Sequence, residues 1–221
     1  MLKTIQFLLL LLISELSFAD NLTFQFIGNM AFYITDGKTA LYSDFPYESG
    51  AFGYMKYDLK SVKISDHGVS LITHAHRDHW ANELFEPLKL KVIGPPEVLK
   101  GVDPSRIIPF AKEITYEGIH VQPFSTPHAN LTHYSYLVTW HRIRMYFSGD
   151  TEELKTLLEM QNLDVAFISP WLARSLTENK QTVEAKNIVI YHHKDGEKVV
   201  APTNAVIPKQ VEIFQIPFRE F

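Results

Sequence analysis

Three histidines and one aspartate crowd together in residues 73–80, as His74, His76, Asp78 and His79. Imidazole nitrogens and carboxylate oxygens are the protein ligands that divalent transition metals prefer. The preceding run of apolar residues predicts a buried strand, at whose end His74 and His76, two positions apart, point to one side and can hold one cation. Asp78 and His79 follow after the chain turns. The spacing predicts half of a two-metal site; the alternative is a solvated polar loop.

A two-metal site needs more ligands, because each cation takes three or four protein groups and keeps a position for water. Further candidates each follow a run of residues typical of a strand. They are His128 after residues 119–124, Asp150 after residues 143–147, and His192 or His193 after residues 187–191. Any one of them could be an ordinary loop residue. Their shared place at strand ends predicts that they converge, although neighbouring residues face opposite ways and only one of the last two should bind.

With these motifs the chain resembles the metallo-β-lactamase-fold hydrolase superfamily, from the strand that begins near Phe24 to His192. It is most similar to the small single-domain branch that includes ascorbate-6-phosphate-lactonase-like enzymes. Residues 73–80 carry this resemblance most strongly, and residues 148–151, Ser-Gly-Asp-Thr, carry it next. The resemblance implies an α/β (α+β) chain folded as a four-layer αββα sandwich.

The resemblance also implies a role for each candidate ligand. The first metal would be bound by His74, His76 and His128, the second by Asp78, His79 and the C-terminal histidine, with Asp150 bridging both. Relatives place the last ligand directly after the apolar strand, which favours His192 over His193. Asp44 matches an aspartate that relatives use behind the metal histidines, where a carboxylate fixes an imidazole tautomer. Its alternative role is that of a turn residue before Pro46.

Two divalent metal ions sharing a water would lower its pKa, and the resulting bridging hydroxide would attack a carbonyl carbon or a phosphorus atom. We therefore expect a metal-dependent hydrolase of a small ester, lactone or phosphodiester, with Asp78 and Asp150 as catalytic carboxylates. The ligands suit zinc, and manganese or iron is compatible. The proton for the leaving group could come from Asp78, the spare histidine or a second water. Aromatic candidates for the substrate pocket, otherwise core or rim residues, are Trp80, Tyr47 and Trp171.

Two other functions fit the same scaffold. One is a metal-binding or sensing protein without turnover, and the other is a β-lactamase. Relatives that are β-lactamases usually carry cysteine or serine where this chain has Asp150, which favours the esterase, lactonase and phosphodiesterase branches. The net charge of −4 and the absence of any lysine- or arginine-rich run argue against a nucleic-acid partner and favour a small-molecule substrate. Oligomeric state is not predicted by any feature of the sequence.

The N-terminus reads as a secretory signal peptide, with an apolar run at residues 7–13 and small residues before Asp20. This run is shorter than the ~20 residues that span a bilayer, so we expect no stable membrane span after cleavage; an uncleaved anchor is the alternative. The predicted organisation is residues 1–19 as signal peptide and residues 20–221 as the metallo-β-lactamase-fold hydrolase domain. Export to a periplasm or to the outside follows from it. No cysteine is present, so no disulfide is expected.

Hydrophobic periodicity predicts the elements that position these residues. The expected strands are residues 22–27, 30–35, 38–43, 69–73, 133–140, 142–147, 164–168, 187–191 and 211–216, with an antiparallel pair at 113–124 and short elements at 91–94 and 105–108. The expected helices are residues 80–89, 151–161 and 178–186.

Overall fold

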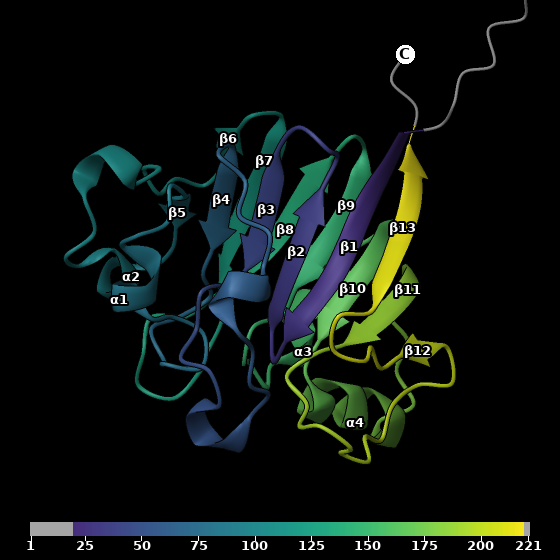
Figure 1. Cartoon of the computed structure of the whole chain (residues 1–221). Helices are drawn as coiled ribbons and strands as arrows, with labels where there is room; N and C mark the ends of the chain where they lie inside the picture. The colour runs from purple at the N-terminus through teal and green to yellow at the C-terminus, as the bar shows by residue number, and fades with distance from the viewer. Residues whose placement is uncertain (1–19, 219–221) are drawn as a thin grey trace, which may run out of the picture.

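Two β-sheets lie face to face in the computed structural model, which describes residues 20–218 (Figure 1). The predicted signal peptide, residues 1–19, lies outside the described residues. In spatial order the first sheet contains β13 (Ile213–Phe218), β1 (Asp20–Gly28), β2 (Ala31–Thr35), β3 (Ala40–Ser43), β4 (Gly68–Leu71) and β5 (Lys91–Ile93). The second contains β12 (Ala205–Val206), β11 (Ala185–Ile190), β10 (Leu163–Ile168), β9 (Ile143–Phe147), β8 (Tyr134–Trp140), β7 (Ile119–Ser125) and β6 (Ile114–Tyr116).

Alternating side chains along the strands build three separate layers of apolar contact. In β9, Met145 and Phe147 point between the sheets, while Tyr146 points to the outer face. The ring of Phe147 stacks on Phe167 of β10 with 4.6 Å between centroids, in the middle of the intersheet core. Each large side chain buried in this way contributes about 1.5–3 kcal/mol. The strand pattern therefore dictates a core with an inner layer and two outer ones.

Helices cover both outer faces of the sandwich. On the first sheet lie α1 (Asn82–Phe85) and α2 (Pro96–Leu99), which bury Phe85 and Val98. On the second lie α3 (Leu154–Glu159) and α4 (Pro170–Glu178), which bury Leu157, Leu172 and Leu176. The predicted four-layer αββα sandwich is confirmed. Within residues 20–218, no helix has the length and apolarity needed to cross a membrane.

Two predicted helices differ from the structure. Residues 80–89 contain only the single turn α1, and the helix expected at residues 178–186 is wrong, because α4 ends at Glu178 and β11 begins at Ala185. The start of α4 is fixed by the side chain of Ser169, which accepts a hydrogen bond from the Leu172 N–H, and by Pro170 in the first turn. The helix ends before Lys180, which has φ +52°, a conformation that a right-handed helix does not contain, and residues from Ala185 onward pair with β10 instead.

Strand direction brings the candidate residues to one edge. β3 and β4 are parallel, and so are β9, β10 and β11. β7 also runs parallel to β9, because each pairs antiparallel with β8. Carboxyl ends of parallel strands meet at the same edge of a sheet, so loops that leave these strands lie close together. Three short 3₁₀ turns complete the fold, at Ala51–Gly53, Leu59–Ser61 and Pro104–Arg106.

Candidate metal centre

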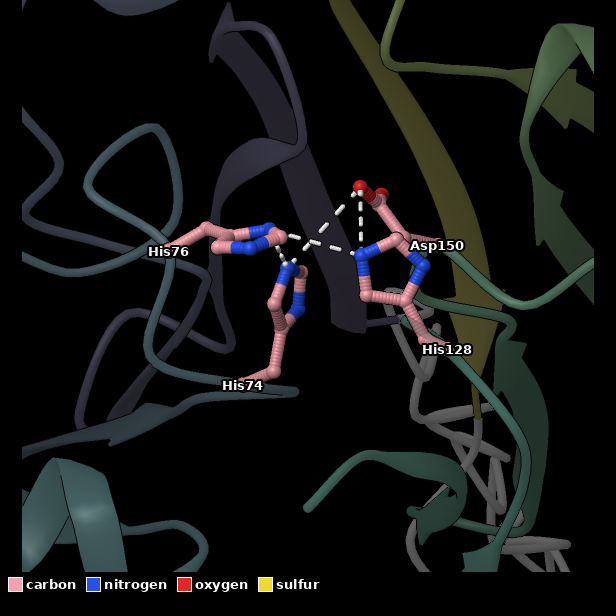
Figure 2. A group of neighbouring side chains, drawn as sticks. All are labelled: His74, His76, His128 and Asp150. Carbon is pink, nitrogen blue, oxygen red and sulfur yellow. Dashed lines mark hydrogen bonds and ion pairs between the residues drawn. The ribbon is translucent and has the colours of Figure 1, made fainter. Parts of the chain in front are cut away.

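Seven side chains that could bind metal converge in two groups at this edge. The first group is His74, His76, His128 and Asp150 (Figure 2), and the second is Asp78, His79 and His192. In each group the ligand atoms all lie within 4.8 Å of one another. They come from loops spread over more than a hundred positions of the chain, as the sequence predicted. The groups contain His192 and not His193.

The carboxylate of Asp150 touches both groups. Its Oδ2 atom lies 3.8 Å from Nε2 of His74 and 3.8 Å from Nε2 of His128. The same oxygen is 3.3 Å from Nε2 of His79, and Oδ1 is 3.1 Å from Nε2 of His192. This geometry suits a carboxylate that bridges two cations.

Asp44 and Thr73 aim two of the histidines. Asp44 Oδ2 accepts from Nδ1 of His79 at 3.1 Å, and the Thr73 hydroxyl donates to the Asp44 carboxylate at 3.0 Å. Because that hydroxyl has one hydrogen, its contact with Nδ1 of His74 at 3.0 Å requires the imidazole to be the donor. Both rings therefore carry hydrogen on Nδ1 and turn Nε2 toward the site. Asp44 thus lies behind the metal histidines, as the resemblance implied.

A chain of hydrogen bonds holds Asp150 from behind. The Asp150 N–H donates to Nε2 of His133 at 2.9 Å, so His133 carries its hydrogen on Nδ1 and donates to the Thr126 hydroxyl at 2.9 Å. Thr126 in turn donates to Ser135, which donates to the Ser148 carbonyl at 2.6 Å. Burial lowers the pKa of His133 to about 3, in agreement with a neutral ring that accepts. No sequence motif includes His133, whose role depends on the position of the β8 start beside the loop after β9.

The turn that presents Asp150 requires a glycine. Gly149 has φ +59°, and a Cβ atom there would collide with the imidazole of His133. Its N–H donates to the Tyr191 hydroxyl at 2.8 Å. Glycine precedes aspartate in the second motif because the turn that presents Asp150 packs closely against His133.

Asn29 connects the loops that carry Asp78 and His192. Its side-chain amide donates to the backbone carbonyl of Asp78 at 2.6 Å, and its backbone carbonyl accepts from the His192 N–H at 2.6 Å. His192 has φ +55°, a backbone conformation that is rare outside glycine and often found at functional sites. His193 points elsewhere, with its ring stacked on Phe26 at 5.7 Å. Backbone geometry therefore decides between the two neighbouring histidines.

The buried charge of the site fits a cation. Asp44, Asp78 and Asp150 are 1%, 3% and 6% exposed, and among residues 20–218 none of the three pairs with a lysine or arginine. Buried carboxylates without a positive partner are strongly unfavourable. Among the described residues, the positive charge that faces them can come only from histidines. The donor set therefore suits divalent metal ions.

The pKa values of these groups follow from the same crowding. Burial opposes the charge on Asp150, but His192 and His79 outweigh it and hold the pKa of Asp150 well below its usual range. Burial also opposes charge on His79, yet Asp150 and Asp44 raise its pKa well above 6.5. Burial, with His79 nearby, lowers the pKa of His74, which leaves that ring neutral. The centre thus combines ionised carboxylates with a neutral His74, while His79 must release its second proton when a cation binds.

The predicted aromatic pocket residues occupy different environments. Tyr47 and Trp80 belong to the buried cluster under the first sheet, and the Tyr47 hydroxyl donates to the Met55 carbonyl at 3.0 Å. Trp171 is only partly buried and lies edge-on to His192, with 5.0 Å between ring centroids. Tyr54, which no sequence motif singled out, lies closer to His192, at 4.2 Å. Trp171 and Tyr54 therefore form the aromatic wall of the centre.

A family model described as "Beta-lactamase superfamily domain" matches residues 23–189. Among curated proteins, none matches the sequence. Solved structures with the same fold include the metallo-beta-lactamase fold protein YhfI from Bacillus subtilis, with 13% identity and a TM-score of 0.69 over 89% of this chain and 99% of that one.

Two further structures share the fold. Igni18, a metallo hydrolase from the archaeon Ignicoccus hospitalis, has 14% identity and a TM-score of 0.67 over 90% of this chain and 100% of its own. A diphosphatase from the PhnP family has 12% identity and a TM-score of 0.59 over 90% and 98%. At such identities these likenesses concern the architecture.

Proposed function

This chain belongs to the beta-lactamase superfamily, and from this premise we propose that it is a metal-dependent hydrolase of a small ester, lactone or phosphodiester. The supporting observation is the convergence of seven ligand side chains in two groups that share Asp150. The named functions of the metallo hydrolase and the diphosphatase with this fold are consistent with the proposal.

Bound divalent cations would supply Lewis acidity and lower the pKa of a water molecule toward neutrality. The residues of this chain supply the positioning. One cation would be held by His74, His76 and His128, and the other by Asp78, His79 and His192. Asp150 would bind both. Asp78 Oδ2, 3.4 Å from Nε2 of His192, has a further lone pair with which to orient the attacking water.

Asp78 is well suited to that role because it is both ionised and fixed. Burial opposes its charge, but the hydrogen bond from His192 and the charge of His79 lower the pKa of Asp78. Its backbone carbonyl accepts from Asn29, which limits the movement of the loop. A carboxylate held in this way accepts a proton without first reorganising.

Zinc is our proposed metal, since three-histidine and histidine–aspartate sets suit it, and manganese or iron is compatible. We also place the chain in the small single-domain branch similar to ascorbate-6-phosphate-lactonase-like enzymes, on the strength of the motifs at residues 73–80 and 148–151. Export is proposed from the sequence of residues 1–19. N-terminal sequencing of protein from the producing cell checks it, with Asp20 expected as the first residue.

Metal removal and restoration test the proposed function. Chelator-treated protein should lose hydrolysis of p-nitrophenyl esters, lactones or bis(p-nitrophenyl) phosphate and regain it with Zn²⁺ or Mn²⁺. Asp78→Ala should abolish turnover while the melting temperature stays close to that of the wild type, because the residue lies at the rim of the core. A protein that binds two metals fully yet hydrolyses none of these substrates would be a metal sensor and would refute the proposal. Full activity of Asp78→Ala would refute the role of Asp78.

A further inference from the structure

The phenol hydroxyl of Tyr54 makes no hydrogen bond to any of the described residues. Its ring stands edge-on to His192, with an interplanar angle of 89° and 4.2 Å between centroids. The hydroxyl of Tyr54 has no hydrogen-bond partner among residues 20–218, whereas Tyr47 and Tyr57 of the same loop donate to the carbonyls of Met55 and Tyr47. A half-buried donor beside a metal centre is therefore left over for a ligand.

The Tyr54 hydroxyl is protonated at neutral pH, because the ordinary pKa of a tyrosine phenol is about 10. A neutral phenol can donate a hydrogen bond, whereas the site carboxylates only accept.

The loop that carries Tyr54 is fixed. The Ser49 hydroxyl donates to the Tyr57 carbonyl and accepts from the Tyr57 N–H, both at 2.9 Å. The Glu48 N–H donates to the carbonyl of Arg77, inside the metal-binding motif, at 2.7 Å. Tyr54 is thus held in place relative to the ligands, which favours a defined contact with substrate over a mobile side chain.

From this geometry we propose that the Tyr54 hydroxyl donates a hydrogen bond to the substrate oxygen that gains negative charge during hydrolysis. This proposal rests on the proposed function. Water adds to the electrophilic atom and gives up a proton to Asp78, the bond to the leaving-group oxygen breaks, and its electron pair stays on that oxygen. The released group takes its proton from solvent, and Tyr54 keeps its own. His193, one earlier candidate for the proton donor, stacks on Phe26 instead.

The variant Tyr54→Phe keeps the ring against His192 and removes only the hydroxyl. A hydrogen bond to a charged oxygen is worth a factor of about 10 to 100, so kcat/KM should fall by that amount, mainly through kcat. Metal content and melting temperature should not change. Tyr116→Phe is the matched control, because Tyr116 is partly buried on β6 and its hydroxyl also lacks a hydrogen-bond partner among residues 20–218, but it lies on another element.

Inorganic phosphate gives a second measurement that does not depend on turnover. Calorimetric titration of metal-loaded protein should show phosphate binding about tenfold weaker in Tyr54→Phe than in wild type or Tyr116→Phe. If the wild type is inert on every substrate but Tyr54→Phe still weakens phosphate, the hydrolase proposal fails and the donor role of Tyr54 stands. Unchanged kinetics and phosphate affinity in Tyr54→Phe overturn the inference while leaving the proposed function intact. Loss of metal, or wild-type protein that neither binds phosphate nor turns over, also overturns it.

Discussion

The imidazole rings on the two sides of the metal centre are oriented by different contacts. On the side of residues 73–80, the far nitrogens of His74 and His79 are engaged by Thr73 and Asp44. On the C-terminal side, Nδ1 of His192 is buried and has no partner among residues 20–218. Its ring is instead flanked by Tyr54 and Trp171. One side is oriented by hydrogen bonds and the other by aromatic packing.

This difference has a physical consequence for metal binding. A hydrogen bond to the far nitrogen fixes both the tautomer and the direction of the lone pair. Packing restricts the plane of the ring but leaves the tautomer free. We therefore expect the His74–His79 side to be formed before metal arrives, and His192 to take its final protonation state when a cation binds.

Asp44→Asn should have the largest effect, because it weakens the side held by hydrogen bonds. Asp44 reaches His79 directly and His74 through the Thr73 hydroxyl, so the variant disturbs one ligand in each group. Metal affinity should fall by about 10- to 100-fold, the usual cost of removing a carboxylate behind a metal histidine. Competition with a chromogenic chelator measures it. Unchanged affinity would show that the hydrogen bonds do not orient these rings.

Trp171→Ala should have a smaller effect, since it removes one aromatic contact from a single ligand, His192. An aromatic contact contributes about 0.5–1.5 kcal/mol, so affinity for the metal held by His192 should fall by roughly 2- to 10-fold. Trp171→Phe is the matched control, because it keeps a ring against His192 and loses the indole bond to the Thr151 carbonyl. If the phenylalanine variant loses as much affinity as the alanine variant, the hydrogen bond rather than the packing supports this side.

The ligands themselves could be predicted from the sequence because each follows an apolar run, and the carboxyl ends of parallel strands share an edge. His128, Asp150 and His192 come together for this reason, although they lie far apart along the chain. The four layers followed from the resemblance, and strand alternation agrees with them. Both depend on local patterns that the sequence displays directly.

The support around the ligands could not be predicted in this way. His133 lies behind Asp150 only because β8 pairs with β9, and a lone histidine at a strand end has many other roles. Tyr54 lies against His192 because the loop after β3 is tied to the motif by Glu48 and Arg77. Such contacts depend on tertiary geometry, which residue spacing does not encode. The preference for His192 over His193 came from the resemblance and not from residue spacing, and the structure groups His192 with Asp78 and His79.

Asp36→Asn should have the smallest effect and provides a reference for the comparison. Asp36 also faces a histidine, His141, at 2.9 Å, but this pair is partly exposed and lies outside both ligand groups. Metal affinity should not change. If it falls as in Asp44→Asn, loss of any histidine–aspartate pair would be enough to weaken the metal centre, and the special role of Asp44 would be wrong.

The same variant should lower stability in a pH-dependent way. Burial opposes the charge on Asp36, but hydrogen bonds from the Thr39 N–H and from His141 outweigh it and lower the pKa of Asp36 below 3.8. A carboxyl with a depressed pKa stabilises the fold above its ordinary pKa, and this stability is lost as the pH falls through the folded value. Asp36→Asn should therefore cost about 1 kcal/mol or less at pH 7, and its difference from wild type should shrink below about pH 4. Urea unfolding at several pH values measures this, and a difference that grows toward acid would contradict the assigned cause.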